Sequence, residues 1–275
     1  MVSLPLAKSL PVAAYQCLML SDVQQKLDCT LRIREQWCCG GLSLKRPGEA
    51  HDACLAGLPE ELEFVPFNRL PKRSLTSKQG HAALIHSFLH IECNAINIAW
   101  DAVYRFQHMP DAFYDDWSRI AAEEAYHFRL LQDYLLTLGY DYGSFPVHGG
   151  LWQMVEQTRS DVMLRMALVP RVLEARGLDV SPGIIRRFRA HEMDEAADIL
   201  QIIYQDEIGH VAIGTKWFNT ICKERGLDSH ATFENLINTY AIDKIRQPFD
   251  LVGREKAGFS QREMKYLHAL EAKKQ

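Results

Sequence analysis

The chain has 275 residues, of which 47% are hydrophobic and 24% charged, enough apolar material for the core of one large domain or two small ones. Its formal net charge of −4 at pH 7 argues against a general attraction to nucleic acid. Its seven cysteines, an odd number with no CxxC pair, argue against a disulfide framework or a zinc site and indicate reduced thiols in a cytoplasmic protein.

The N-terminal stretch is mildly apolar, but prolines at positions 5 and 11 interrupt it, and it continues into the polar sequence SDVQQK. We therefore predict a tail that leads into a helix rather than a signal peptide. No stretch reaches the ~20 apolar residues of a membrane span, so no membrane partner is expected. Residues 12–38 are predicted to form one amphipathic helix that ends at Gly40-Gly41, and residues 41–80 an extended, proline-containing segment laid over the body.

Long helical patterns dominate from residue 79 onward and predict four core helices. They lie at about 79–108, 111–138, 151–177 and 192–225. Pro110-Asp111 opens the second helix and Gly139 closes it, while Gly226 ends the fourth. Pro170 lies in the middle of the third pattern, where its missing N–H predicts a kink or a later helix start.

Shorter accessory helices are predicted around these four. One begins with Ser181 as N-cap and Pro182 at the first position, and another covers about 230–246. A last one begins at Ser260, which makes a capping box with Glu263. The prediction is an all-α protein in which a four-helix bundle follows an N-terminal segment and precedes accessory helices. The predicted domain boundaries are 1–78, 79–226 and 227–275.

Each predicted core helix carries an apolar stripe that is interrupted by a carboxylate, and in two helices a histidine follows one turn later. Burying an unpaired carboxylate costs several kcal/mol, so four such interruptions in one core require compensation. A pair of metal ions would offset all four together. The candidate ligands are Glu92, Glu124, His127, Glu174, Glu207 and His210.

The spacing of these residues is an internal repeat. A single Glu precedes an ExxH motif twice, with 32 residues from Glu92 to Glu124 and 33 from Glu174 to Glu207. An ExxH motif alone has little specificity in a chain with this many Glu and His residues. Two such helix pairs packed face to face would bring four carboxylates and two imidazoles to one point, and exposed or ion-paired helix charges are the alternative.

Four carboxylates and two imidazoles form a hard, oxygen-rich set that suits iron first and manganese second. Structural zinc, which prefers four ligands and often sulfur, is disfavoured. Glu123 and Asp206 each precede an ExxH motif and are candidates to accept the free N–H of a ligand imidazole. Their alternative is an ordinary exposed acid.

This Glu and ExxH pattern resembles the ferritin-like superfamily, in which a four-helix bundle holds two iron or manganese ions. The stretches LVPRVLEARGLDV and ILQIIYQDEIGHVAIG further resemble a bacterial ferritin-like family known as domain of unknown function 455, over about residues 15–265. The resemblance implies a ferritin-like four-helix bundle with additional N- and C-terminal helices. It carries the superfamily's metal-ligand positions onto the six candidate ligands. The wider relatives include ferritins, manganese catalases, ribonucleotide reductase small subunits and di-iron tRNA hydroxylases.

The first functional hypothesis is an O2-activating di-iron oxidoreductase, a hydroxylase or monooxygenase acting on a small organic molecule. Because the sequence shows no flavin, NAD or iron–sulfur motif, electrons are expected from a separate reductase. The alternative is metal handling: ferroxidase activity, iron storage or peroxide disposal without an organic substrate. A third reading is that the metal only holds the bundle together.

Two further partners are left open. The similarity to tRNA hydroxylases makes tRNA a candidate substrate, which the net acidity disfavours, and a homodimer is compatible with the sequence. The basic residues that could contact tRNA are Lys72-Arg73 and Arg186 to Arg189.

His86 and His90 are interpreted as ordinary hydrogen-bonded histidines rather than ligands. Tyr126 and Tyr204 are interpreted as core tyrosines with satisfied hydroxyls rather than electron carriers.

Overall fold

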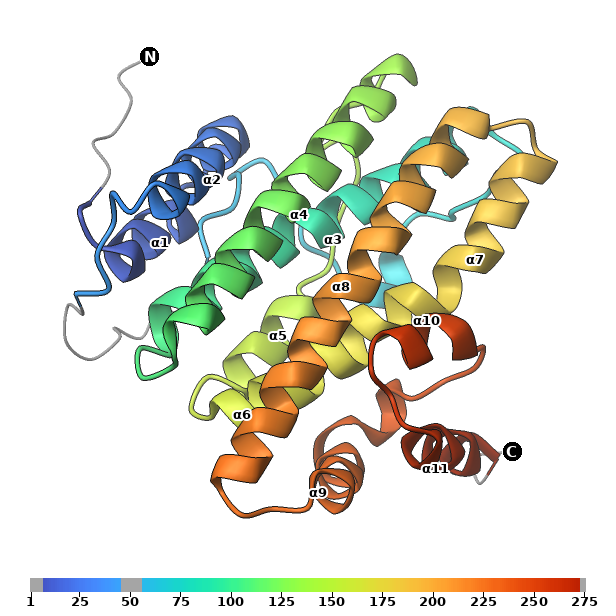
Figure 1. Cartoon of the computed structure of the whole chain (residues 1–275). Helices are drawn as coiled ribbons and strands as arrows, with labels where there is room; N and C mark the ends of the chain where they lie inside the picture. Colours follow the sequence, from blue (N-terminus) through green and yellow to red (C-terminus); the bar gives the residue numbers. More distant parts are fainter. Residues whose placement is uncertain (1–6, 46–55, 273–275) are drawn as a thin grey trace. The chain divides into compact units, whose positions relative to one another are not determined.

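The protein is all-α in the part described by the computed structural model, residues 7–45 and 56–272, which confirms the predicted fold class (Figure 1). Two isolated β-bridges are formed there, but no strand. The chain divides into two compact units, Met1–Trp152 and Gln153–Gln275. The predicted tail at 1–6 and Cys54 lie outside the described residues. The cysteines within the described residues are free thiols.

The first unit begins with two helices where the sequence predicts one. α1 (Leu10–Leu18) and α2 (Val23–Cys38) are separated at Asp22, whose carboxylate accepts a hydrogen bond from the Gln25 N–H at 2.7 Å. The single helix over 12–38 is therefore wrong, because this N-cap starts a new helix within the amphipathic pattern. The predicted end is confirmed, since Gly40 has a φ of +70° directly after α2.

A buried lysine fixes this pair of helices to the rest of the first unit. Lys26 of α2 is 1% exposed, and its ammonium group donates hydrogen bonds to Leu18 O at 3.1 Å, Gly57 O at 2.6 Å and Asn97 Oδ1 at 2.5 Å. All three acceptors are neutral. Burial lowers the pKa of the Lys26 ammonium group.

The extended segment predicted at 41–80 is confirmed in its described part, apart from the single turn η1 (Phe67–Arg69). Residues 46–55 of that prediction lie outside the described residues. The segment is attached to a later loop, because the Val65 N–H donates to Val147 O at 2.8 Å and the Val147 N–H donates to Glu63 O at 2.9 Å.

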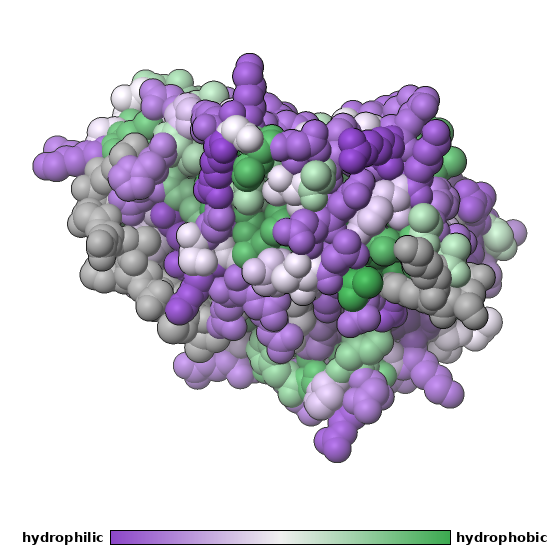
Figure 2. Space-filling view, turned by 90° about the horizontal axis from the view of Figure 1, so that it is seen from below, coloured by the Kyte–Doolittle hydropathy of each residue, from purple (hydrophilic) through white to green (hydrophobic). Residues whose placement is uncertain are grey.

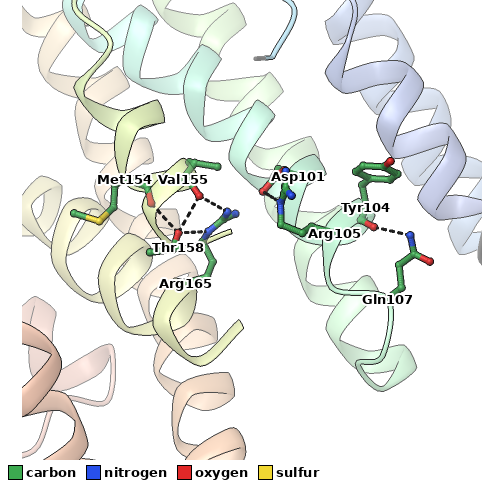
Figure 3. Close-up of polar contacts among 8 residues, drawn as sticks. All are labelled: Asp101, Tyr104, Arg105, Gln107, Met154, Val155, Thr158 and Arg165. Atoms are coloured by element: carbon green, nitrogen blue, oxygen red, sulfur yellow. Dashed lines mark hydrogen bonds and ion pairs between the residues drawn. The ribbon is translucent and has the colours of Figure 1, made fainter. Parts of the chain in front are cut away.

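α3 (Lys78–Arg105) and α4 (Asp111–Thr137) are uninterrupted helices that lie side by side as a hairpin, as predicted (Figure 1). Gly139 has a φ of +82° and closes α4. Near the end of α3, Arg105 donates to the fully buried Asp101 carboxylate at 2.7 Å (Figure 3). This pair fixes the last turn of the helix before the chain reverses.

α5 (Gly150–Gln157) spans the boundary between the units, and in the second unit the predicted third helix is broken into several pieces. α6 (Val162–Leu168) is followed by a π-helical turn, η2 (Val169–Glu174), and by α7 (Ala175–Ala190). α6 begins at Asp161, whose carboxylate accepts from the Met163 N–H at 2.8 Å. The buried Arg165 ties α6 to the end of α5 through Thr158 Oγ1 at 2.7 Å and Val155 O at 2.8 Å (Figure 3).

The separate helix predicted after Ser181 is wrong, because Ser181 and Pro182 lie inside α7. The Ser181 hydroxyl donates to Gly177 O at 2.8 Å, one turn back, rather than capping a new helix. The expected disturbance at Pro170 is present and takes the form of the π-helical turn. A proline cannot donate to the carbonyl one turn earlier, and a wider turn accommodates the missing hydrogen bond.

α8 (Asp194–Glu224) forms as predicted and ends at Gly226, which has a φ of +67°. The predicted helix at 230–246 is α9 (Ser229–Leu236), continued by a π turn, η3 (Ile237–Ala241), and a short turn, η4 (Ile242–Lys244). α10 (Leu251–Lys256) is not predicted by the sequence. α11 (Gln261–Ala272) has the predicted capping box: the Ser260 N–H donates to Glu263 Oε2 at 2.8 Å, and the Glu263 N–H donates to Ser260 Oγ at 3.2 Å.

The face of the molecule in Figure 2 carries mostly hydrophilic side chains with smaller apolar groups between them. In the described residues, no helix has the length and apolar character that a membrane crossing requires.

The predicted bundle at 79–226 would take helices from both units, and it stays a prediction.

Candidate metal centre

The first unit brings three of the predicted ligands together, and we call them the first triad: Glu92 of α3 with Glu124 and His127 of α4. Their exposed fractions are 4%, 0% and 0%. The ExxH spacing places Glu124 and His127 on one face of α4. His127 Nδ1 lies 3.1 Å from Glu124 Oε2 and 3.7 Å from Glu92 Oε2. Each residue offers a ligand atom within 4.8 Å of the others, so the three could hold a metal ion.

Apolar residues surround the first triad on the same two helices, as the stripes in the sequence predict. Water is therefore largely excluded, and charges within the triad are weakly screened. Buried apolar residues on these two helices include Ile85, Leu89, Ile96, Ala99, Ile120, Ala121, Phe128, Leu131 and Leu135.

The electrostatics of the first triad favour a bound cation. Burial, and then the neighbouring Glu124 carboxylate, raises the pKa of the Glu92 carboxyl group well above its usual range. Within the described residues, Glu92 Oε2 is buried without a hydrogen-bond partner. Such an atom costs free energy unless another group or an ion satisfies it. The donor set, two carboxylates and an imidazole, fits a divalent iron or manganese ion in chemistry as well as in spacing.

The second unit carries the other three predicted ligands, which we call the second triad: Glu174, Glu207 and His210. Glu207 and His210 lie one turn apart on α8, with 3.8 Å between Glu207 Oε1 and His210 Nδ1. His210 is 1% exposed and the Glu207 side chain 13%. Glu174 is half-buried and is the last residue of the π turn η2.

The contact between Pro170 and Gly214 sets the level of Glu174 along α8. A Cβ atom added at Gly214 would lie 2.2 Å from Pro170 Cγ, so only glycine allows the π turn to approach α8 this closely. α7, which continues directly from the π turn, and α8 run antiparallel, because only residues 191–193 join them. Glu174 comes four residues after Pro170, and His210 four residues before Gly214. The two ligand candidates therefore lie at the same level.

The two residues predicted to support the imidazoles lie beside the ExxH motifs. Glu123 forms an ion pair with Arg119, one turn earlier on α4, at 3.6 Å, and its side chain is 31% exposed. Asp206 is half-buried on α8. Their role as hydrogen-bond acceptors for His127 or His210 stays a prediction.

His86 and His90 are hydrogen-bonded histidines, as predicted. His86 Nε2 accepts from the Gly143 N–H at 3.0 Å, and His90 Nδ1 lies 2.8 Å from the Tyr142 hydroxyl. Burial lowers the pKa of each imidazole to about 4. Both rings are consequently neutral near pH 7. His90 also lines a small pocket of the first unit together with Arg73, Ser87 and His148.

The two tyrosines differ from each other. Tyr126 is 48% exposed, so its predicted place in the core is wrong. It lies between Ala125 and His127 and consequently points away from the buried face of α4. Tyr204 is half-buried and donates its hydroxyl hydrogen to Asp250 Oδ2 at 2.5 Å, so its predicted satisfied hydroxyl is confirmed. Burial and then this carboxylate raise the pKa of Tyr204 to about 12.

Sequence reasoning missed two residues at the π turn: Gly214, which meets Pro170 from α8, and Arg171, whose side chain is fully buried. A signal for Gly214 was present, since a glycine inside a long apolar helix face often marks a close approach of another backbone. The signal for Arg171 was an arginine directly after Pro170 in an otherwise apolar run. Neither signal says which partner the residue meets.

Comparison with known proteins gives the family. Residues 19–265 match the family described as "Protein of unknown function (DUF455)". An uncharacterized protein of Haemophilus influenzae is 42% identical over 224 residues, which cover 79% of this chain and 78% of that protein. No solved structure matches the chain. With a match over most of its length, the chain belongs to the DUF455 family.

Proposed function

We propose that the first and second triads supply the six ligands of one di-metal centre, and that the protein is an O2-activating di-iron oxidoreductase of ferritin-like fold. The observation that carries the proposal is the buried triad Glu92, Glu124 and His127, in which two carboxylates lie beside an imidazole in apolar surroundings. The equal order of ligand types in the second unit supports a paired centre, because a second ion needs its own imidazole and carboxylate.

The chain's residues would act in three ways. The four carboxylates would neutralise the positive charge of the ions, and the two neutral imidazoles would each occupy one coordination position. The apolar faces of α3 and α4 would keep water from the site. When bound, the metal pair supplies the redox chemistry of O2 reduction. With no cofactor motif in the sequence, the electrons would come from a separate reductase, and the substrate would be a small organic molecule rather than tRNA.

The first experiment measures metal per chain in protein grown with ordinary iron and manganese, for the wild type and for single alanine variants. We expect about two irons per chain. Glu207→Ala and His210→Ala should lose two-metal occupancy and keep their helical circular dichroism, and so should Glu124→Ala and His127→Ala. Glu195→Ala is the matched control, since Glu195 is an exposed acid of α8. It should keep both ions.

The outcomes separate the parts of the proposal. Full metal retention in Glu207→Ala and His210→Ala would remove the second triad from the site, even if the first triad still binds an ion. Consumption of O2 by the reduced protein that depends on an added organic compound would support oxidoreductase activity. Consumption that depends only on added ferrous iron or peroxide would replace it with metal handling.

A further inference from the structure

The π turn that ends at Glu174 is held by a cluster of side chains that the proposed function does not use. Arg171, the third residue of η2, has a side chain that is 0% exposed. Its guanidinium carbon lies 4.8 Å from the ring centre of Phe218, 4.0 Å from that of Phe233 and 4.8 Å from that of Phe259. One of its amino groups donates to Glu263 Oε1. We call these four partners the Arg171 cage.

One member of the cage, Phe218, belongs to α8, and the other three come from the chain beyond it. Phe233 belongs to α9, Phe259 precedes α11, and Glu263 lies in the first turn of α11. Glu263 is held in turn by the capping box, since its other oxygen accepts from the N–H and hydroxyl of Ser260. The carboxylate therefore has a fixed position when it meets the arginine.

An arginine at this position is not explained by stability. Replacing a buried ion pair by apolar side chains of similar volume is often neutral or stabilising. Among the described residues, the Nε and Nη1 atoms of Arg171 are buried without hydrogen-bond partners, which adds a further cost. The arginine does have a fixed orientation, because cation–π contacts and an ion pair restrict its guanidinium group in several directions at once.

The two sides of the π turn thus have separate anchors. Pro170 rests against Gly214 of α8, and Arg171 enters the cage, of which three members come from beyond α8. Glu174 is the last residue of the same turn. π-helical turns are unstable in isolation and persist where the surroundings hold them. The two anchors therefore fix the backbone from which the Glu174 side chain projects.

We propose that Arg171 is a positioning residue, which fixes the π turn through the Arg171 cage and thereby aims Glu174 at the metal. The proposal rests on the proposed function, because it treats Glu174 as a ligand. It also gives the helices beyond residue 226 a role in the metal site that their distance in sequence does not suggest.

The matched control is Arg254, another buried arginine of the second unit that also contacts Phe259. It is 2% exposed, its guanidinium also lies 4.8 Å from the ring centre of Phe259, and it forms an ion pair with Asp179 at 2.7 Å. Arg254 lies on α10 and its carboxylate partner on α7, so the pair does not include the π turn. Arg171→Met and Arg254→Met each remove one buried charge from one ion pair.

The test compares these two variants with the wild type by titration with Mn²⁺ and by hydrogen exchange of the metal-free proteins. In Arg171→Met we expect Mn²⁺ affinity to fall by about tenfold or more, as for other residues that orient a metal ligand, and amide exchange to rise within 169–178. Arg254→Met should keep its Mn²⁺ affinity within about twofold. Glu263→Gln serves as a second variant if Arg171→Met does not fold.

Each outcome has a defined meaning. Unchanged Mn²⁺ affinity in both Arg171→Met and Glu263→Gln would overturn the positioning role, and an equal loss in Arg254→Met would replace it with general destabilisation. A wild type that binds no metal would reject the proposed function instead. In that case the exchange measurement on the metal-free proteins still decides whether Arg171 holds the π turn.

Discussion

The two helix hairpins that carry the triads have the same order of ligand types but different backbones. α3 and α4 are regular throughout, and in the first triad His127 Nδ1 lies 3.1 Å from Glu124 Oε2. In the second unit the helix that carries Glu174 is interrupted by a π turn, and the corresponding distance on α8 is 3.8 Å. A repeat of residue types thus does not require a repeat of local geometry.

The difference teaches that each hairpin depends on a different kind of anchor. Lys26 holds α3 through Asn97, five residues after Glu92, and all its acceptors are neutral. Arg171 holds the π turn through aromatic rings and a carboxylate. Both are buried cations, but Lys26 reaches the ligand-bearing α3 from α2, whereas Arg171 is part of the segment that carries Glu174. In the first unit the buried cation joins the regular helix α3 to the neighbouring helix α2. In the second unit the buried cation stabilises the irregular backbone of the π turn in which it lies.

The most direct way to break the irregular hairpin is Gly214→Ala. The added methyl group would overlap the Pro170 ring, which cannot rotate away, and we expect a loss of about 3 kcal/mol in the free energy of unfolding. Gly209→Ala is the control on the same helix, because a Cβ there meets nothing within 4 Å. It should be neutral or stabilising by about 0.5–1 kcal/mol. Urea unfolding measures both, and equal midpoints for the two variants would contradict the close approach.

The anchor of the regular hairpin is tested by Lys26→Met. The substitution leaves the carbonyls of Leu18 and Gly57 and the Asn97 amide oxygen without their donor, although it also removes a buried charge. We expect a net loss of about 2 kcal/mol in the free energy of unfolding. Gln25→Met, an exposed position of α2, should change it by less than about 0.5 kcal/mol. A variant at position 26 as stable as wild type would show that the three hydrogen bonds do not hold α3.

A smaller expected effect is a dependence of the first unit's free energy of unfolding on pH, through His86. Burial and the nearby Arg73 lower the pKa of His86 to about 4, while Asp141 acts in the opposite direction. The unfolded chain therefore binds the proton more tightly, so stability is complete above about pH 6.5 and is lost as the pH falls towards 4. At pH 5.5 we expect a loss of about 1.4 kcal/mol from this residue.

His86→Gln is the variant that isolates this loss, because glutamine can still accept from the Gly143 N–H but does not titrate. Urea midpoints of wild type and variant should agree near pH 7.5 and separate at pH 5.5, with the wild type less stable. Parallel pH profiles for the two proteins would show that His86 is not the titrating group.

The sequence was sufficient for the elements whose signals are local and long. α3, α4 and α8 have extended apolar faces, and glycines follow α4 and α8. Their predicted bounds agree with the structure within a few residues. The errors fall where one short side chain chooses between a cap and a helix interior. Asp22 and Asp161 cap helices inside patterns that look continuous, while Ser181, which looks like a cap, bonds to the preceding turn.

For the site, the spacing of apolar and acidic residues was enough to predict which side chains share a helix face. The first triad lies together as predicted, because a regular helix converts spacing directly into position. Pro170 indicated that the helix is interrupted but not that the interruption is a π turn. Whether a proline kinks a helix, delays it or widens one turn depends on the surface it meets, here Gly214 and the Arg171 cage, and sequence periodicity does not specify that surface.

The ion pair between Arg171 and Glu263 joins residues that are 92 positions apart. During synthesis on the ribosome the arginine is therefore made long before the carboxylate that receives it. Until α11 has emerged, Glu174 belongs to a turn with one of its two anchors missing. The candidate metal site would thus be among the last parts of the protein to mature, and metal insertion would naturally follow completion of the chain.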